Sequence, residues 1–234
     1  MFKQMKWYLE CWWTIMARPI YFYSVLKEES WKEKALSFLM ITAWIAAFAL
    51  TALIFIIQYI PIGGTLVEGI TGYKFIIILP VLITLALVFS VITVLILGGV
   101  MVGLFGAASF AIAYSLHYIY RLLGGKGKAE RMLQLVFYGS AVFLTIIFPV
   151  IFALLTKMGV LDFPLFRVGF NLFYGLTALF AYGLWAVAGR KNYGLSKTQA
   201  FVGALAPVIL FLIFGFLFDK IVLPKLETWI TPLK

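Results

Sequence analysis

The stretch FIIILPVLITLALVFSVITVLILGGVMVGLFGAASFAIAYSLHYIY, from Phe75 to Tyr120, runs for 46 residues without an Asp, Glu, Lys or Arg. A run this free of charge cannot form the surface of a soluble domain, so it lies in a bilayer or inside a bundle of similar segments. Lipid offers the backbone no hydrogen bonds, so only helices or closed barrels cross it. Barrel strands alternate apolar and polar residues, whereas this run is continuous, which predicts an all-α, polytopic transmembrane bundle.

The composition of the whole chain supports a membrane protein. Hydrophobic residues make up 64% of the 234 residues and charged residues 12%, against about 25% charged residues in soluble domains. The net charge of +10 comes from Lys and Arg in short segments beside the apolar runs, where they set orientation and face anionic headgroups. We therefore expect membrane lipids, and no nucleic acid, as partners. The single Cys11 excludes an internal disulfide, and an unmodified interfacial thiol is expected there rather than a palmitoylated one.

Apolar stretches divide the chain into three parts. Residues 1–34 form an N-terminal segment, residues 35–223 a transmembrane helical domain, and residues 224–234 a short C-terminal tail. Within the domain, spans are predicted at about residues 35–60, 75–123, 132–156, 168–188 and 199–218. Pro61, Gly63 and Gly64 are expected to end the first span. Helix starts are marked by the capping boxes Ser30–Glu33 and Ser196–Gln199 and by the Asp162–Pro164 pair.

The N-terminal segment has an amphipathic pattern. Apolar side chains recur at helical spacing, and polar side chains lie on the other side; the first set is Phe2, Met5, Leu9, Trp12, Trp13 and Met16, and the second Lys3, Lys6, Glu10 and Thr14. This pattern predicts an interfacial helix that ends before Pro19. Packing of the same helix beneath the bundle is an equally weighted alternative.

The long apolar run decides the topology. As one straight helix, residues 75–123 would measure about 73 Å at 1.5 Å per residue, against a hydrocarbon core of about 30 Å. We therefore expect a kink or an unwound turn between Gly98 and Gly106, where four glycines cluster. If the run crosses once and the N-terminus is inside, inner segments hold 13 Lys and Arg and outer segments 6; two crossings would give 11 and 8. The positive-inside rule favours five net spans, a cytoplasmic N-terminus and cytoplasmic loops at 121–131 and 189–198.

Few residues within the spans suggest chemistry. No Asp or Glu lies in an expected span, which argues against proton-coupled carriers, and one histidine, His117, cannot build a multi-histidine metal site. We expect no catalytic, metal or cofactor site, and an interior filled by aromatic and aliphatic side chains. Gln58 and Asn171, with His117, are candidates for intramembrane polar contacts. The glycines at Gly99, Gly103 and Gly106 are candidates for close helix packing.

The order of several landmarks resembles a known family. They are, in chain order, Ile15-Met-Ala-Arg-Pro19 with Phe22, Ser30-Trp31, the glycine-rich basic loop Leu123-Gly-Gly-Lys-Gly-Lys128, Leu135-Val-Phe-Tyr-Gly139 with Pro149, Trp185 followed by a Gly-Arg-Lys turn, and Tyr193-Gly-Leu-Ser-Lys-Thr-Gln-Ala200 with Pro207. This pattern resembles the Yip domain family of Ypt/Rab-interacting membrane proteins, particularly its prokaryotic relatives. The resemblance implies five spans, a cytoplasmic N-terminus and a non-enzymatic role. It implies a small-GTPase partner only for a eukaryotic-like member, whose long polar N-terminal region this chain lacks.

Two functions are compatible with these features. The first is a non-enzymatic membrane organiser or scaffold that binds lipid, other membrane proteins or a second copy of itself. The second is a small channel or transporter for a lipid or a small solute. A continuous polar pathway between the spans would favour transport, and a closed apolar bundle would favour the scaffold. We expect a multi-pass location, in the cytoplasmic (inner) membrane if the source is prokaryotic.

Overall fold

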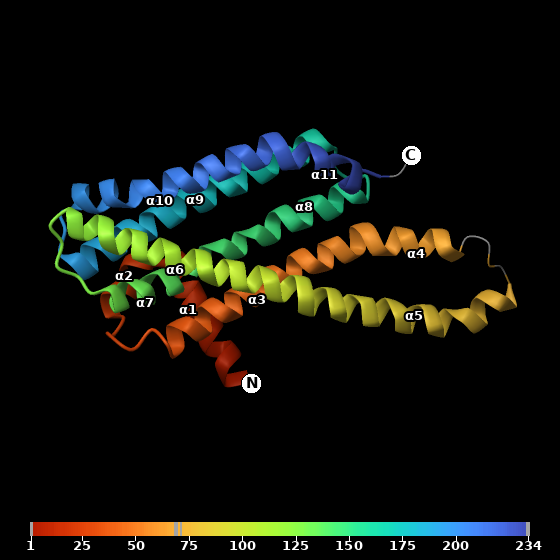
Figure 1. Cartoon of the computed structure of the whole chain (residues 1–234), viewed down its shortest axis with the longest axis horizontal. Helices are drawn as coiled ribbons and strands as arrows, with labels where there is room; N and C mark the ends of the chain where they lie inside the picture. Colours follow the sequence, from red (N-terminus) through yellow and green to blue (C-terminus); the bar gives the residue numbers. More distant parts are fainter. Residues whose placement is uncertain (1, 68–69, 71, 233–234) are drawn as a thin grey trace.

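The computed structural model of the chain describes residues 2–67, 70 and 72–232, and its regular elements there are all helical (Figure 1). The α-helices are α1 (Phe2–Ala17), α2 (Pro19–Val25), α3 (Lys34–Ile54), α4 (Ile60–Val67), α5 (Tyr73–Thr93), α6 (Gly99–Leu122), α7 (Ala129–Gly139), α8 (Ile147–Lys157), α9 (Phe163–Tyr193), α10 (Lys197–Leu217) and α11 (Leu223–Ile230). Short π or 3-10 turns join several of them end to end. The predicted all-α architecture is confirmed.

Five continuous helices within the described residues are long and apolar enough to cross a membrane. They are Lys34–Thr65, Tyr73–Leu122, Ala129–Lys157, Phe163–Tyr193 and Lys197–Ile230. The chain is therefore a multi-pass membrane protein by length and composition. The connections α6–α7 and α9–α10 lie at one end of the bundle, and the α8–α9 connection and α11 lie at the other (Figure 1). Together with residues 26–34, the first two connections form what we call the basic end.

The long apolar run forms one continuous helix, so the kink predicted between Gly98 and Gly106 is wrong. A π-helical turn at Val94–Gly98 joins α5 to α6, and the chain from Gly99 onward is regular α-helix. Each glycine weakens a helix by up to about 1 kcal/mol. Opening the helix in lipid would leave backbone groups unpaired at several kcal/mol each, so continuity is favoured. Gly98 also lies in contact with α3, because a Cβ there would be 3.5 Å from the Trp44 ring.

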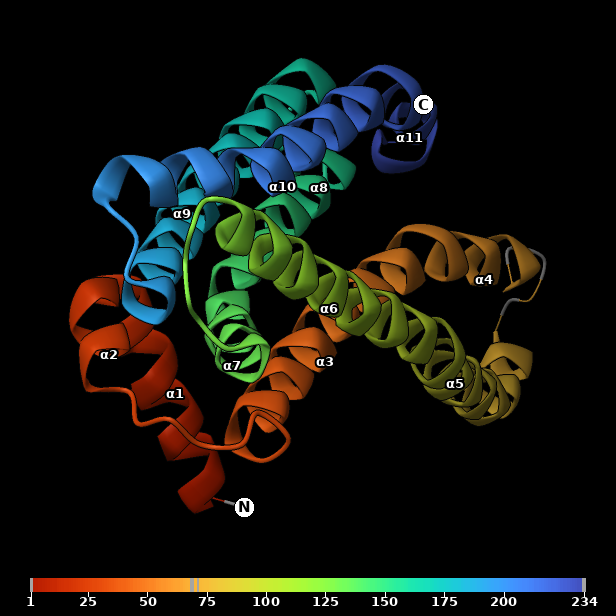
Figure 2. The ribbon, with the colours of Figure 1, turned by 60° about the vertical axis from the view of Figure 1, so that its left-hand side comes forward.

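The first span also continues beyond its predicted end. Pro61, Gly63 and Gly64 lie inside α4 rather than in a loop. A π-helical turn at Phe55–Tyr59 comes just before Pro61, and the widened turn accommodates a residue that lacks a backbone N–H. Figures 1 and 2 show α4 and α5 extending away from the other helices, and α5 has no buried residue. The long helix thus projects beyond the bundle instead of breaking.

Helix starts follow the predicted caps in two of three cases. The Asp162 carboxylate accepts a hydrogen bond from the Leu165 N–H at 2.9 Å, and the Ser196–Gln199 capping box is complete. The capping box predicted at Ser30–Glu33 is wrong, since α3 starts at Lys34 without a side-chain cap. The ring of Trp31 packs edge-on against Phe110 and Phe137. That tertiary packing holds residues 31–33 in a turn before the helix begins.

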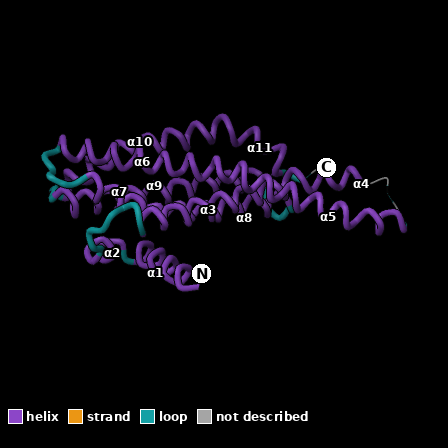
Figure 3. Tube along the Cα trace, turned by 60° about the horizontal axis from the view of Figure 1, so that its bottom comes forward, coloured by secondary structure: helices purple, strands orange, loops and turns teal. Residues whose placement is uncertain are grey.

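Both terminal segments contain helices. Helix α1 ends before Pro19 as predicted, and α2 follows it directly. Figure 3 shows α1 and α2 as a layer outside the long helices. At the other terminus, the predicted tail is helical to Ile230, which is buried together with Leu223. The final two residues of that predicted tail lie outside the described residues.

The main core lies where α3, α6, α7 and α9 meet and is rich in aromatic side chains. Phe38 and Phe137 are fully buried there, and Tyr138 packs against Phe38 with ring centroids 5.3 Å apart. A second cluster near the other end joins α8, α9 and α11 around Phe163 and Phe166. The main core, which includes Tyr193 and Leu195, holds the connections of the basic end in fixed positions.

Candidate functional site

The glycine-rich loop between α6 and α7 lies tightly against the end of α9. Gly124 has φ 91°, in the left-handed region that favours glycine. A Cβ at Gly125 would be 2.6 Å from the Cβ of Tyr193, and a Cβ at Gly127 would be 2.7 Å from the carbonyl oxygen of Asn192. The three glycines are therefore required for the loop to follow this path.

Hydrogen bonds fasten the same loop to α9. The Asn192 side chain donates from Nδ2 to the Lys128 carbonyl at 2.9 Å and accepts from the Lys128 N–H at 3.4 Å. The Lys126 N–H donates to the Tyr193 carbonyl, and the Gly125 N–H to the Tyr120 carbonyl. Lys126 and Lys128 are thereby held on either side of a glycine at a defined place above α9.

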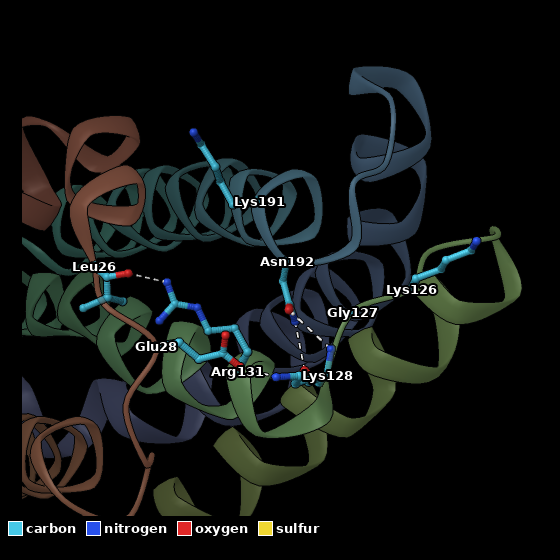
Figure 4. A pocket seen from close by; sticks show the side chains of 8 residues that line it. All are labelled: Leu26, Glu28, Lys126, Gly127, Lys128, Arg131, Lys191 and Asn192. Atoms are coloured by element: carbon cyan, nitrogen blue, oxygen red, sulfur yellow. Dashed lines mark hydrogen bonds and ion pairs between the residues drawn. The ribbon is translucent and has the colours of Figure 1, made fainter.

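A pocket of about 370 Å³ opens beside this loop (Figure 4). Three chain segments supply its lining: the strand-like stretch after α2, the loop with the start of α7, and the end of α9. The lining residues are Leu26, Glu28, Lys126, Gly127, Lys128, Arg131, Lys191 and Asn192. Four of these are basic and one is acidic, and the side chains of Lys126 and Lys191 extend outward from the rim (Figure 4).

Arg131 holds one wall of the pocket in place. Its guanidinium donates to the carbonyl of Leu26 at 2.5 Å and to the carbonyl of Lys27 at 2.7 Å. Gln134, which lies one turn further along α7, donates to the same Lys27 carbonyl at 3.0 Å. The connection between α2 and α3 is thus anchored on α7, and Arg131 has a structural role as well as a charge facing the pocket.

Glu28, the acidic residue of the lining, already forms an ion pair with Lys128. The Lys128 ammonium lies 3.0 Å from the Glu28 carboxylate, and both side chains are more than half exposed. The hydrogen bond from Lys128, followed by the charge of Lys128, lowers the pKa of Glu28 below its ordinary value. An exposed pair of this kind contributes little to stability, so the carboxylate can leave Lys128 at small cost.

Buried, hydrogen-bonded side chains of α6 lie beneath the loop. His117, one of the predicted polar residues, is buried and shares a hydrogen bond between its Nδ1 and the Tyr193 hydroxyl. The Tyr120 hydroxyl reaches the carbonyls of Trp185 and Ala200 at 2.9 and 3.2 Å. The Tyr120 ring fits only because Gly189 and Gly203 lack side chains; a Cβ at either would come within 2.5 Å of it.

Asn171, another predicted polar residue, lies in an ion-pair cluster toward the other end. Its amide donates to Asp219 Oδ1 at 2.9 Å, and Arg167 donates to both carboxylate oxygens of Asp219 at 2.7 and 2.6 Å. Asn171 was singled out from the sequence, but the pairing of Arg167 with Asp219 was not predicted. A signal was present, because the two charges stand at similar distances from the α9–α10 turn, and antiparallel helices bring such positions together.

The remaining predicted residues are not brought together. Gln58 lies half-buried in the π-helical turn Phe55–Tyr59, and its side chain forms no hydrogen bond with another described residue. At Gly99, Gly103 and Gly106, a Cβ would meet nothing within 4 Å. The prediction was that these glycines serve close helix packing, but among the described residues no other helix packs closely against this face of α6. Val102 and Ser109 face the bundle instead, because 3.6 residues per turn place them on the adjoining side of α6.

Within the described residues, no group of three or more His, Cys, Asp or Glu side chains is placed to hold a metal ion. Comparison of the chain with protein-family models, with curated proteins and with solved structures finds no match.

Proposed function

We propose that this protein is a non-enzymatic membrane organiser, which binds lipid and other membrane proteins or a second copy of itself. The proposal includes the resemblance to the Yip family and a cytoplasmic N-terminus. It rests on the way in which α1 is presented, and it is supported by the pairing of polar side chains between the helices of the bundle. Three observations about α1 carry the argument.

One face of α1 is fixed to the bundle. Tyr8 and Ile15 are buried, and the Tyr8 hydroxyl shares a hydrogen bond of 2.8 Å with Thr42 of α3. The Trp12 indole donates to the Ala141 carbonyl at 3.2 Å. Burial raises the pKa of the Tyr8 hydroxyl. The helix is thus held in one rotational setting against the transmembrane domain.

A second face of α1 is apolar and exposed. Met5, Leu9 and Trp13 follow one another at intervals of four residues and are 51%, 55% and 66% exposed. Such residues share one side of a helix. The third face carries Lys6 and Glu10, whose charged groups lie 3.9 Å apart in an exposed pair. A helix with one side against protein, one apolar and one charged suits the boundary between bundle, lipid and water.

The interior of the bundle supports binding rather than transport. Polar side chains between its helices pair within the protein: Thr145 and Thr177 share a hydrogen bond of 2.6 Å, and Tyr174 donates to the Phe211 carbonyl. The Tyr174 and Phe211 rings also stack at 4.5 Å between centroids. Among the described residues, Ser140 Oγ is the buried side-chain atom without a hydrogen-bond partner. Packing of this kind, with paired polar groups and stacked rings, favours a binding role over a solute pathway between these helices.

Reconstitution of the purified protein tests the proposal. We expect wild-type protein at high density to change the shape of phosphatidylcholine vesicles, as seen by electron cryomicroscopy, without releasing a trapped dye. The triple variant Met5→Gln, Leu9→Gln, Trp13→Gln should leave the vesicles round, whereas Lys6→Gln with Glu10→Gln serves as the matched control on the charged face. Dye release or lipid scrambling by the wild type would instead establish a channel or transporter.

A further inference from the structure

We infer that the pocket lined by Lys126, Lys128, Arg131 and Lys191 is a binding site for a phosphate group, supplied by an anionic phospholipid headgroup or by a soluble phosphate. The site lies at the basic end of the bundle, between the glycine-rich loop and the end of α9. This inference depends on the proposed function only for the source of the phosphate.

Charge is concentrated at this end. The segments 26–34, 121–131 and 190–197 contain ten Lys or Arg residues and four Glu. Among the residues that line the pocket, four are cationic and one is acidic. An excess of positive charge between membrane helices attracts anionic headgroups, and such basic pockets are a recurrent form of lipid site. The excess here is held on three chain segments that the fold brings together.

The backbone adds donors of fixed direction. No side chain caps α7, whose first residue is Ala129, so the first N–H groups of the helix lack intrahelical acceptors. The Asn192 side chain accepts a hydrogen bond from the Lys128 N–H, but not from the N–H groups of the first residues of α7. Because Gly125 and Gly127 tie the loop to Tyr193 and Asn192, the direction of these donors is set before any ligand binds.

Glu28 indicates where an anion would sit. Its carboxylate accepts a hydrogen bond from Lys128 at 3.0 Å and is the acidic group among the lining residues. A phosphate oxygen can take the same place on the ammonium, with a higher charge than the carboxylate. Glu28 therefore acts as an internal competitor. It is exposed enough to swing aside when a stronger anion arrives.

The pocket size suits a phosphate ester. A volume of about 370 Å³ is at the lower end of the range for small-molecule sites, which is about 300–1,000 Å³. The space accommodates a phosphate with a small attached group. Lys126 and Lys191 extend from the rim (Figure 4), and their long, flexible side chains can fold over such a group.

Binding by the full-length protein tests the inference. One arm uses protein in detergent with inorganic phosphate, followed by thermal stabilisation. The other uses nanodiscs of phosphatidylcholine with and without phosphatidic acid, followed by native mass spectrometry of the retained lipid. Binding in the first arm identifies soluble phosphate as a ligand, and binding in the second alone identifies a headgroup. No binding in either arm would overturn the inference.

Four variants assign the binding to the pocket. Lys128→Gln with Lys191→Gln should weaken phosphate or phosphatidic acid binding at least tenfold, whereas Lys197→Gln, an exposed lysine at the same end, should change it less than twofold. Glu28→Gln should strengthen binding severalfold, because the competitor is removed. Lys191→Gln alone keeps the Glu28–Lys128 pair, so weaker binding by this variant cannot be attributed to a folding defect caused by loss of the pair. Equal binding by the double variant and Lys197→Gln, or weaker binding by Glu28→Gln, would overturn the site. The vesicle-shape experiment does not depend on these variants.

Discussion

The guanidinium of Arg167 on α9 donates two hydrogen bonds to the Asp219 carboxylate, from Nε to Oδ1 at 2.7 Å and from Nη2 to Oδ2 at 2.6 Å. Asp219 lies in the π-helical turn Phe218–Val222, which follows α10. Asn171 adds a third hydrogen bond to the same carboxylate. A paired Arg–carboxylate bridge is the strong form of such contacts. It joins the two most extensively packed helices of the bundle near the end opposite the basic pocket.

Asp219→Asn should destabilise the protein more than removal of the neighbouring lysine, because it leaves the Arg167 guanidinium without its charged acceptor. Thermal unfolding in detergent, followed by tryptophan fluorescence, measures the loss. Lys220→Gln is the matched control: its ammonium is 3.8 Å from Asp219 and 58% exposed, so it should cost less than about 1 kcal/mol. Equal losses for the two variants would contradict the Arg167–Asp219 pairing.

Two glycines on neighbouring helices should respond to alanine in opposite ways. Gly203→Ala places a Cβ 2.4 Å from the Tyr120 ring, and the resulting overpacking should cost about 1–3 kcal/mol. Gly103→Ala meets nothing within 4 Å and should stabilise α6 by up to about 1 kcal/mol. Thermal unfolding of both variants checks this. Destabilisation by Gly103→Ala would mean that the open face of α6 is covered in the native protein.

The Glu28–Lys128 pair should make a small, pH-dependent contribution to stability. The pKa of Glu28 is lowered in the folded protein, chiefly by the hydrogen bond from Lys128. A lowered carboxylate pKa stabilises the fold above the ordinary pKa of about 4.5, and this stabilisation disappears as the pH falls through the folded value. The difference in melting temperature between wild type and Glu28→Gln should therefore shrink from pH 6 to pH 3. A difference that grows with acidity would refute the pair.

Local signals in the sequence predicted local structure well. Asp162 and Ser196 cap their helices because a capping residue needs only its neighbours along the chain. Ser30 does not, because its turn is set by Trp31 packing on residues about 80 and 106 positions away. The break expected at Gly98–Gly106 failed for a related reason. The free energy by which glycine weakens a helix is small compared with the cost of leaving backbone N–H and C=O groups unpaired in lipid.

The candidate site was only partly visible in the sequence. The glycine-rich basic loop was recognised as a landmark. Its contact with Asn192, and that of Arg131 on α7 with Leu26, join segments that are far apart along the chain. The same holds for Arg167 and Asp219. Pairings between spans depend on how the helices pack, and the apolar pattern of a membrane helix says little about which side faces which neighbour.

Labelling of introduced cysteines should reveal the sidedness of the basic end. In a Cys11→Ser background, Lys126→Cys at the basic end should resist an impermeant maleimide added to intact cells. Met158→Cys, 75% exposed between α8 and α9, should react. This follows from the excess of Lys and Arg at the basic end and the positive-inside rule. The reverse pattern would place the N-terminus outside.

The depth of α1 in a reconstituted bilayer tests the proposed membrane role most directly. Leu9 and Glu10 are adjacent in sequence but lie on the exposed apolar and charged faces of α1. In the Cys11→Ser background, an environment-sensitive fluorophore at Leu9→Cys should be quenched by spin-labelled lipid and protected from iodide. The same fluorophore at Glu10→Cys should be quenched by iodide. Equal access of iodide to both positions would show that α1 does not contact lipid and would contradict a membrane organiser acting through this helix.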